Sequence, residues 1–307
     1  MISFDSATAR EFEKKQLKKK NIIVLTEMIS SLLWAIFIFS AILCRTESVK
    51  GWLYIFALLF VVISGGLWIY RTYYQGIEGQ NSAADNTARK IFLNELCSDS
   101  AVMQLSSLAA KQHRFTDRAN VMVYLADTYV YRGQFDDAFR TMFSIDVTFF
   151  REHPTTALVY YNELINFYEK TGDLESIIGV YNDAQYYIEA CAEKCYETYR
   201  FSRGMWASWQ RAMGNNSFYL ENLEDEINTK RAAVQTGKLN KNRAYLFFFG
   251  VNLLELAEEM YRMGERERAN ALCAESLMYF GENPYYYGRA VSLKQRIEEE
   301  SRLGNNS

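Results

Sequence analysis

The chain has 307 residues, 49% of them hydrophobic and 15% aromatic, so it can bury a sizeable core and does not belong to the disordered class. Its formal net charge is −3, with 26 Lys and Arg against 32 Asp and Glu from Arg71 onward, and this balance argues against nucleic-acid binding. Only two prolines occur, which favours an all-α protein because proline interrupts helices.

Residues 1–20 form a basic segment with six Lys and Arg against three Asp and Glu. We expect a short juxtamembrane helix whose basic end faces a lipid bilayer. Lys and Arg near a membrane segment resist translocation, so this charge predicts a cytoplasmic amino terminus.

Residues 21–74 contain two apolar runs, Ile22 to Cys44 and Gly51 to Tyr70, on either side of the polar segment Arg45 to Lys50. Each run has about the 20 residues that a helix needs to cross the bilayer. The pattern predicts a two-helix transmembrane hairpin, and two spans return the carboxyl terminus to the cytoplasm. Glu27 lies about one turn inside the first run, where its side chain can reach the interface.

Three small residues, Ser64, Gly65 and Gly66, allow close approach of another helix to the second run. The first run is the expected neighbour. A second copy of the chain is the alternative, which would make the protein a homo-oligomer.

After a polar linker at residues 75–86, helical patterns begin near Thr87 and continue to residue 303, before a tail at 304–307. A first helix pair is expected to break at residues 98–100, and Pro154 and Pro284 each precede a new helical pattern. Four glycines at the ends of helical patterns predict turns, namely Gly133, Gly172, Gly214 and Gly264.

The segment Asn120 to Ile145 resembles a tetratricopeptide repeat (TPR). In that family a large residue, a Leu and small-residue pair, an aromatic residue, a turn glycine and an alanine occur at fixed offsets. Here these are Met122, Leu125–Ala126, Tyr129, Gly133 and Ala138. The pattern recurs less faithfully at Tyr161, Leu164, Tyr168, Gly172, Tyr181 and Ala184, and at Leu253, Leu256–Ala257, Met260, Gly264 and Ala269.

The resemblance implies a TPR-like α-solenoid of antiparallel helix pairs over residues 87–303. The four turn glycines are 39, 42 and 50 residues apart, whereas the family period is about 34. HEAT-like or other α-solenoid packing fits these longer spacings and stays an alternative.

In the TPR family the first helix of each pair faces a concave groove that binds peptides. The resemblance therefore places on a groove the residues Val123, Asp127, Tyr131, Asn162, Asn166, Ser208, Arg211, Leu254, Glu258 and Arg262. Asn162 and Asn166 lie one helical turn apart and could hydrogen-bond a peptide backbone. The alternative is that these positions are simply solvated.

Motifs for chemistry are lacking. With only two His residues, no phosphate loop and no nucleophile motif, we expect no cofactor, no metal and no enzymatic activity. Cys191 and Cys195 are four residues apart, which would place them on one helix face, and packing is the expected role for both.

The sequence therefore predicts a membrane-anchored scaffold whose helical groove binds a protein or peptide at the cytoplasmic face. Its expected partners are the lipid bilayer and a protein or peptide, with no nucleic acid. The alternative is a ligand-sensing or regulatory protein in which the helical domain couples to oligomerisation of the hairpin.

Overall fold

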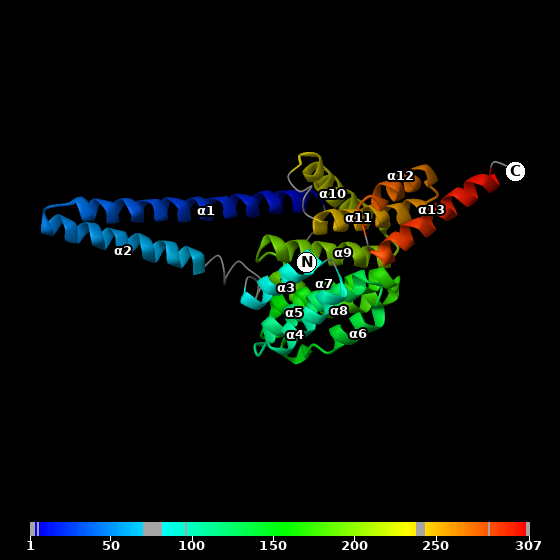
Figure 1. Cartoon of the computed structure of the whole chain (residues 1–307), viewed down its shortest axis with the longest axis horizontal. Helices are drawn as coiled ribbons and strands as arrows, with labels where there is room; N and C mark the ends of the chain where they lie inside the picture. The colour runs from blue at the N-terminus through cyan, green and yellow to red at the C-terminus, as the bar shows by residue number, and fades with distance from the viewer. Residues whose placement is uncertain are drawn as a thin grey trace. The chain divides into compact units, whose positions relative to one another are not determined.

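The computed structural model describes residues 4, 6–69, 82–95, 97–237, 243–281 and 283–304. This part of the chain is all-α and contains no strand, which confirms the fold class expected from the scarcity of proline. The helices in Figure 1 are α1 (Ser6–Leu43), α2 (Glu47–Ile69), α3 (Ala83–Glu95), α4 (Asp99–Ala110), α5 (Phe115–Tyr131), α6 (Phe135–Phe143), α7 (Pro154–Thr171), α8 (Leu174–Cys191), α9 (Tyr196–Ala212), α10 (Asn216–Gln235), α11 (Arg243–Arg262), α12 (Arg266–Leu277) and α13 (Pro284–Gly304), with a 3-10 helix at Val147–Phe149.

Two compact units make up the chain. The first comprises Met1–Glu78 together with Tyr186–Arg203, and the second comprises Gly79–Gln185 together with Gly204–Ser307. The end of α8 and the start of α9 thus group with the amino-terminal helices.

In the first unit, α1 is a single helix of 38 residues that joins the basic segment to the first apolar run. This corrects the expectation of a separate juxtamembrane helix. The physical reason lies in the sequence, because neither Gly nor Pro occurs between Ser6 and Leu43 to interrupt the helix. Helix α2 begins at Glu47, four residues before the expected start of the second run.

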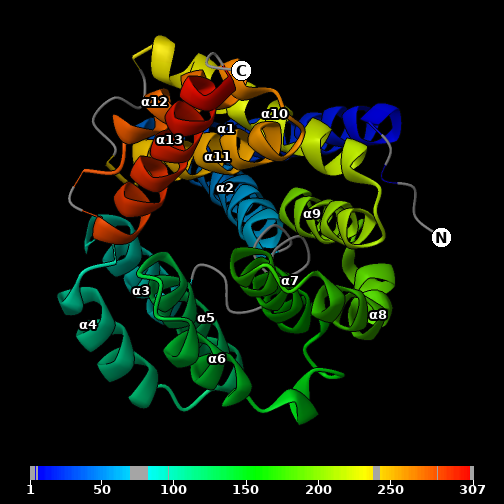
Figure 2. The same cartoon turned by 90° about the vertical axis from the view of Figure 1, so that its right-hand side faces the viewer.

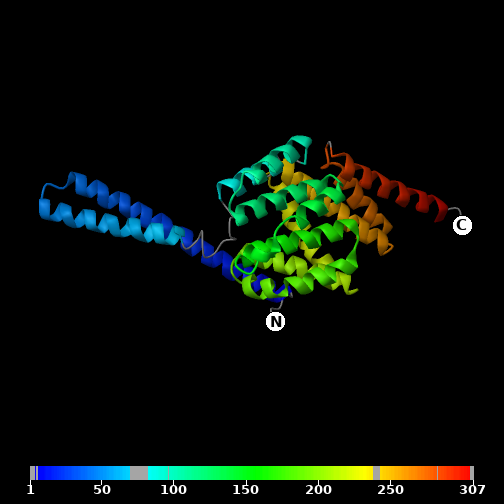
Figure 3. The ribbon, with the colours of Figure 1, turned by 90° about the horizontal axis from the view of Figure 1, so that it is seen from below.

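Helices α1 and α2 lie side by side and run antiparallel (Figures 1 and 3). The Ser30 hydroxyl donates to the carbonyl of Phe60 at 3.0 Å, and the Ser64 hydroxyl donates to the Ser30 hydroxyl at 2.8 Å. Ser64 therefore faces α1, whereas Gly65 and Gly66 are exposed and a Cβ at either would meet no atom within 4 Å.

Both helices are long and apolar enough to cross a membrane, over Lys14–Leu43 and Glu47–Leu67. Only 11% and 6% of their most apolar windows are buried within the protein. These helices are therefore unlike the buried core helices of a globular domain, because most of their large apolar side chains are exposed.

Tyr199 of α9 completes the first unit. Its ring is 1% exposed and stacks on Phe12 of α1 at a centroid distance of 4.1 Å, and Phe4 contacts the same ring at 5.6 Å. The amino-terminal part of α1 is thus held by aromatic contacts to α9.

In the second unit, helix pairs pack in succession, as expected for a helical repeat (Figure 2). The turn glycines Gly133, Gly172, Gly214 and Gly264 all have positive φ, between 73° and 88°, which confirms the predicted helix ends. The small residues of the repeat pattern are buried between helices; Ala126, Ala138, Ala184, Ala257 and Ala269 are each 0% exposed.

In the second unit, two predicted helix starts agree with the structure and the start of α3 shifts. Helices α7 and α13 begin at Pro154 and Pro284 as predicted. Helix α3 begins at Ala83 rather than near Thr87, because the Ser82 hydroxyl accepts from the Asp85 amide at 3.1 Å and caps the helix. Residues 75–81 of the predicted linker and 305–307 of the predicted tail lie outside the described residues. The rest of the linker from Ala83 belongs to α3, and Gly304 ends α13.

Helix α11 contacts α3 as well as α12 and α13. Phe92 of α3 stacks on Phe248 of α11 at 5.6 Å, and Tyr131 of α5 contacts Phe247 at 5.9 Å. Helix α11, near the end of the second unit, therefore packs against α3 at the beginning of the same unit. Charged side chains of α11 also face those of α7 and α9.

Candidate functional site

Buried ion pairs connect α11 to the first helices of the preceding pairs. Lys170 of α7 binds Glu255 of α11, and their side chains are 9% and 16% exposed. Arg211 of α9 binds Glu259 of α11 and lies 3.9 Å from Glu169 of α7. Because each pair joins helices that are distant in sequence, these contacts fix how α11 lies against α7 and α9.

Helix α13 adds a further ion pair to the same face of α11. Arg289 donates through one terminal nitrogen to both oxygens of Glu258, at 2.8 and 2.7 Å. Its guanidinium also lies over the rings of Tyr285 and Tyr286, at 5.7 and 5.4 Å. Charge-assisted hydrogen bonds of this kind are stronger than neutral ones and hold the two helices in register.

Two acids, Asp127 of α5 and Glu163 of α7, meet beside these ion pairs. Burial raises the pKa of Asp127 well above its usual value, and the neighbouring Glu163 raises it further, while Lys170 acts in the opposite direction. Glu163 is 6% exposed and accepts from the Asn166 amide at 3.0 Å. This environment favours a proton shared by the two acids, since two carboxylates in contact cannot both be charged at low cost.

The residues predicted for a groove lie on the first helices of their pairs. They are Asp127 and Tyr131 on α5, Asn162 and Asn166 on α7, Ser208 and Arg211 on α9, and Glu258 and Arg262 on α11. Most are half-buried, whereas Ser208 is buried and Arg262 is exposed. The two apolar residues of the set, Val123 and Leu254, are 8% and 0% exposed and belong to the core.

Ion pairs within the chain already engage the charged members of this set, Arg211, Glu258 and Arg262. Asn162 lies beside Gly204 of α9. That these residues contact a partner stays a prediction. Five charged residues of the network were not predicted, namely Glu169, Lys170, Glu255, Glu259 and Arg289. A signal was present in α11, where three acids interrupt an otherwise apolar pattern.

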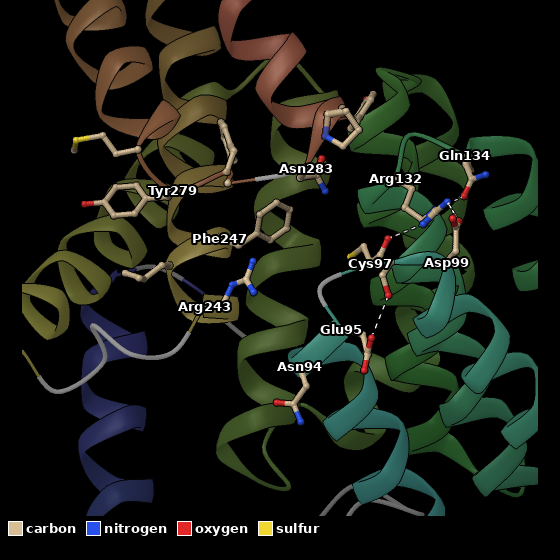
Figure 4. A pocket seen from close by; sticks show the side chains of 17 residues that line it. Asn94, Glu95, Cys97, Asp99, Arg132, Gln134, Arg243, Phe247, Tyr279 and Asn283 are labelled. Atoms are coloured by element: carbon tan, nitrogen blue, oxygen red, sulfur yellow. Dashed lines mark hydrogen bonds and ion pairs between the residues drawn. The ribbon is translucent and has the colours of Figure 1, made fainter.

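A cleft of about 750 Å³ lies elsewhere in the second unit (Figure 4). Its walls come from the α3–α4 turn, the α5–α6 turn, the start of α11 and the connection between α12 and α13. This volume is within the range of ligand pockets. The labelled side chains that line it are Asn94, Glu95, Cys97, Asp99, Arg132, Gln134, Arg243, Phe247, Tyr279 and Asn283.

Arg132 organises one wall of the cleft. Its guanidinium donates to the Cys97 carbonyl at 2.8 Å, to the Asp99 carboxylate and to the Gln134 amide oxygen. Cys97 has φ of 66° and is the only non-glycine residue with positive φ in the described ranges. Burial raises the pKa of the Cys97 thiol to about 12, so the thiol stays protonated and unreactive at neutral pH.

Asn283 and Arg243 define the opposite wall. The Asn283 amide donates to the Tyr131 carbonyl at 3.1 Å, and its oxygen accepts from the Tyr286 amide at 3.0 Å, which joins the start of α13 to the end of α5. Arg243 is exposed at the start of α11 and forms no ion pair with any described residue. Figure 4 shows its guanidinium directed into the cleft, near Phe247.

The cleft thus combines amide groups, aromatic rings and a guanidinium that no described acid pairs with. A carboxylate could pair with Arg243, a peptide backbone could hydrogen-bond Asn94, and an apolar side chain could contact Phe247 and Tyr279. Such a surface suits a peptide segment better than a uniformly apolar or uniformly charged molecule.

None of the five cysteines, all of which the structure describes, forms a disulfide. The expectation that Cys191 and Cys195 share a helix face is wrong, because α8 ends at Cys191 and Cys195 lies in the turn before α9. Both are buried, and burial raises the pKa of Cys195. Within the described ranges, no group of three or more His, Cys, Asp and Glu residues is arranged to hold a metal ion.

No protein-family model matches the chain, and comparison with curated proteins and with solved structures finds no significant similarity.

Proposed function

We propose that the protein is a membrane-anchored helical scaffold, with α1 and α2 as a transmembrane hairpin and a TPR-like α-solenoid that binds a peptide segment in the cytoplasm. The exposed apolar surface of α1 and α2 supports the anchor. The excess of Lys and Arg before residue 21 supports the cytoplasmic placement of both termini.

The observation that carries the binding role is the cleft of about 750 Å³ with Arg243 directed into it. The charged groups of the network at α11 are already paired within the chain, whereas Arg243 has no ion-pair partner among the described residues. We therefore place the peptide contact at the cleft, with a carboxylate of the partner at Arg243 and an apolar side chain at Phe247.

Affinity capture from detergent-solubilised membranes tests the binding role. Arg243→Glu reverses the charge in the cleft and should remove partners that the wild type retains, without unfolding the chain because the side chain is exposed. Arg118→Glu makes the same charge change at an exposed position outside the cleft and should retain them. The same partners with all three proteins would contradict the placement at the cleft.

Reporter fusion to the carboxyl terminus tests the topology. A reporter that is active only in the cytoplasm should be active, and one that is active only after export should be inactive. The reverse result would contradict the cytoplasmic placement.

The alternative role, in which the helical domain couples to oligomerisation of α1 and α2, is favoured by one observation. Gly65 and Gly66 leave an open strip on α2 that no described residue of the chain covers. A second copy could approach closely there.

A further inference from the structure

The basic and apolar parts of α1 belong to one continuous helix, so the helical rise gives the height of each lysine above the level at which α1 would enter a membrane. Its 38 residues span about 57 Å at 1.5 Å per residue, whereas the hydrocarbon layer is about 30 Å thick. If the apolar run enters the hydrocarbon at Ile22, then Lys18 lies about 6 Å and Lys14 about 12 Å outside it. These heights correspond to the headgroup layer and its outer edge.

A shallow hollow of about 350 Å³ runs along one face of α1 at this level. It is lined by Lys14, Lys18, Asn21, Ile22 and Leu25, which share a helix face because they are separated by three or four residues. Ile22 and Leu25 are 55% and 58% exposed, and both lysines are exposed. The hollow is therefore cationic at its outer end and aliphatic at its inner end.

This face is not the one that packs within the first unit. Phe12, which stacks on Tyr199, points about 160° away from Lys14 around the helix axis, at 100° per residue. Neither Lys14 nor Lys18 forms an ion pair with a described residue. The aromatic contacts thus hold α1 while leaving the two ammonium groups exposed.

We infer that this face of α1 binds one anionic phospholipid, with its phosphate at Lys18, a second anionic or polar headgroup atom at Lys14, and an acyl chain along Ile22 and Leu25. The inference rests on the proposed insertion of α1 in a membrane. A phospholipid matches the hollow in both charge and polarity, because it places anionic oxygens directly outside an aliphatic chain at the same depth. A soluble anion would leave Ile22 and Leu25 exposed.

Native mass spectrometry of the full-length protein in detergent tests this inference. Phosphatidylglycerol and phosphatidylcholine, which share acyl chains but differ in net charge, are added separately. The wild type should retain more phosphatidylglycerol than phosphatidylcholine. Lys14→Gln/Lys18→Gln should weaken that binding by about 30-fold, which corresponds to two lysine contacts at a membrane surface.

Lys90→Gln/Lys111→Gln is the matched control, since it removes two exposed lysines from the helical domain and should bind as the wild type does. Three outcomes would each overturn the inference. The wild type could retain the two lipids equally, Lys14→Gln/Lys18→Gln could keep the wild-type preference, or millimolar inorganic phosphate could displace the lipid.

Alkaline extraction of membranes separates this result from a failure of the anchor. Release of the wild-type chain from the membrane would contradict the proposed anchor itself. A chain that stays in the membrane and shows no lipid preference would overturn only the lipid site.

Discussion

At the residue scale, Lys170 is an ammonium group in an environment that disfavours its charge. Burial lowers its pKa to about 8, although Glu169, Glu258 and Glu163 all favour the protonated form. Its partner Glu255 is also nearly buried. A buried pair of this kind adds little net stability, but removal of one partner leaves the other as an uncompensated buried charge.

Replacing Lys170 by Met should therefore lower the free energy of unfolding by about 3 kcal/mol. Chemical denaturation of the protein in detergent, followed by the circular dichroism of the helices, measures this change. Lys90→Met, at an exposed position, should change stability by less than about 0.5 kcal/mol. The double variant Lys170→Met/Glu255→Met should recover part of the loss. Equal destabilisation by the two single variants would contradict the role assigned to the pair.

The acid pair predicts a pH effect with a definite sign. Because burial raises the pKa of Asp127 in the folded state, the native chain retains a proton that the unfolded chain releases. This contribution to stability is fully present below the usual pKa of Asp and is lost as the pH rises through the folded-state pKa.

Asp127→Asn removes that titration. It should raise the free energy of unfolding at pH 7 relative to the wild type, and by less at pH 4. Denaturation at both pH values measures the difference, and Asp183→Asn, at an exposed position, is the control. A variant that tracks the wild type across this range would show that Asp127 is ionised in the fold.

Residue-level prediction from sequence succeeded where helical spacing alone decides the outcome. Helical spacing predicts Asp127, Arg211 and Glu258 on first helices, and they lie there with side chains directed at other helices. Asn166 also lies on its predicted helix, but its side chain bonds Glu163 of the same helix. Their partners could not be predicted, because the contact of Lys170 with Glu255 spans 85 positions and depends on how α11 packs.

At the element scale, the turn glycines differ in what surrounds them. A Cβ at Gly133 would lie 2.4 Å from the ring of Tyr285, whereas a Cβ at Gly214 would meet nothing within 4 Å. Both have positive φ, which costs an L-residue about 1 to 2 kcal/mol.

Gly214→Ala should therefore lower the free energy of unfolding by about 1 kcal/mol, through backbone strain alone. Gly133→Ala should cost about 3 kcal/mol, because overpacking against Tyr285 adds to the strain. Thermal or chemical denaturation of the two variants measures the difference. If the costs are equal, the α5–α6 turn does not pack against α13 as described.

Element types and ends were predictable because glycine and proline act locally. The positive φ of Gly172 and Gly264 and the starts of α7 and α13 follow from single residues. The break between Cys191 and Cys195 was not predicted, because no Gly or Pro marks it. There the Thr198 hydroxyl accepts from the Cys195 amide at 3.0 Å and caps the start of α9. This cap is hard to recognise in the sequence, because the helical pattern of α8 continues up to it.

At the scale of the whole molecule, the open strip on α2 allows a test of self-association. Gly65→Leu/Gly66→Leu should leave the packing of α1 on α2 intact, because both glycines are exposed and point away from α1. If the strip forms an interface between copies, these substitutions should reduce self-association in a membrane two-hybrid assay at least several-fold. Unchanged association would show that the open strip on α2 is not an interface between copies.

Ser30→Ala is the matched change on the opposite side of the pair. It removes the donor to Phe60 and the acceptor for Ser64, and it should loosen α1 against α2 without affecting association between copies.

The sequence by itself determined the helical class, the two apolar helices, the glycine ends of α5, α7, α9 and α11 and the proline starts of α7 and α13, because composition, hydrophobic runs, glycine and proline act over a few residues. It did not determine that the basic segment and the first apolar run form one helix, that α11 pairs with α7 and α9, or that a cleft forms around Arg243. Only the tertiary structure decided these, because buried ion pairs and cleft walls arise from residues far apart in the chain, and no local pattern specifies which of them meet.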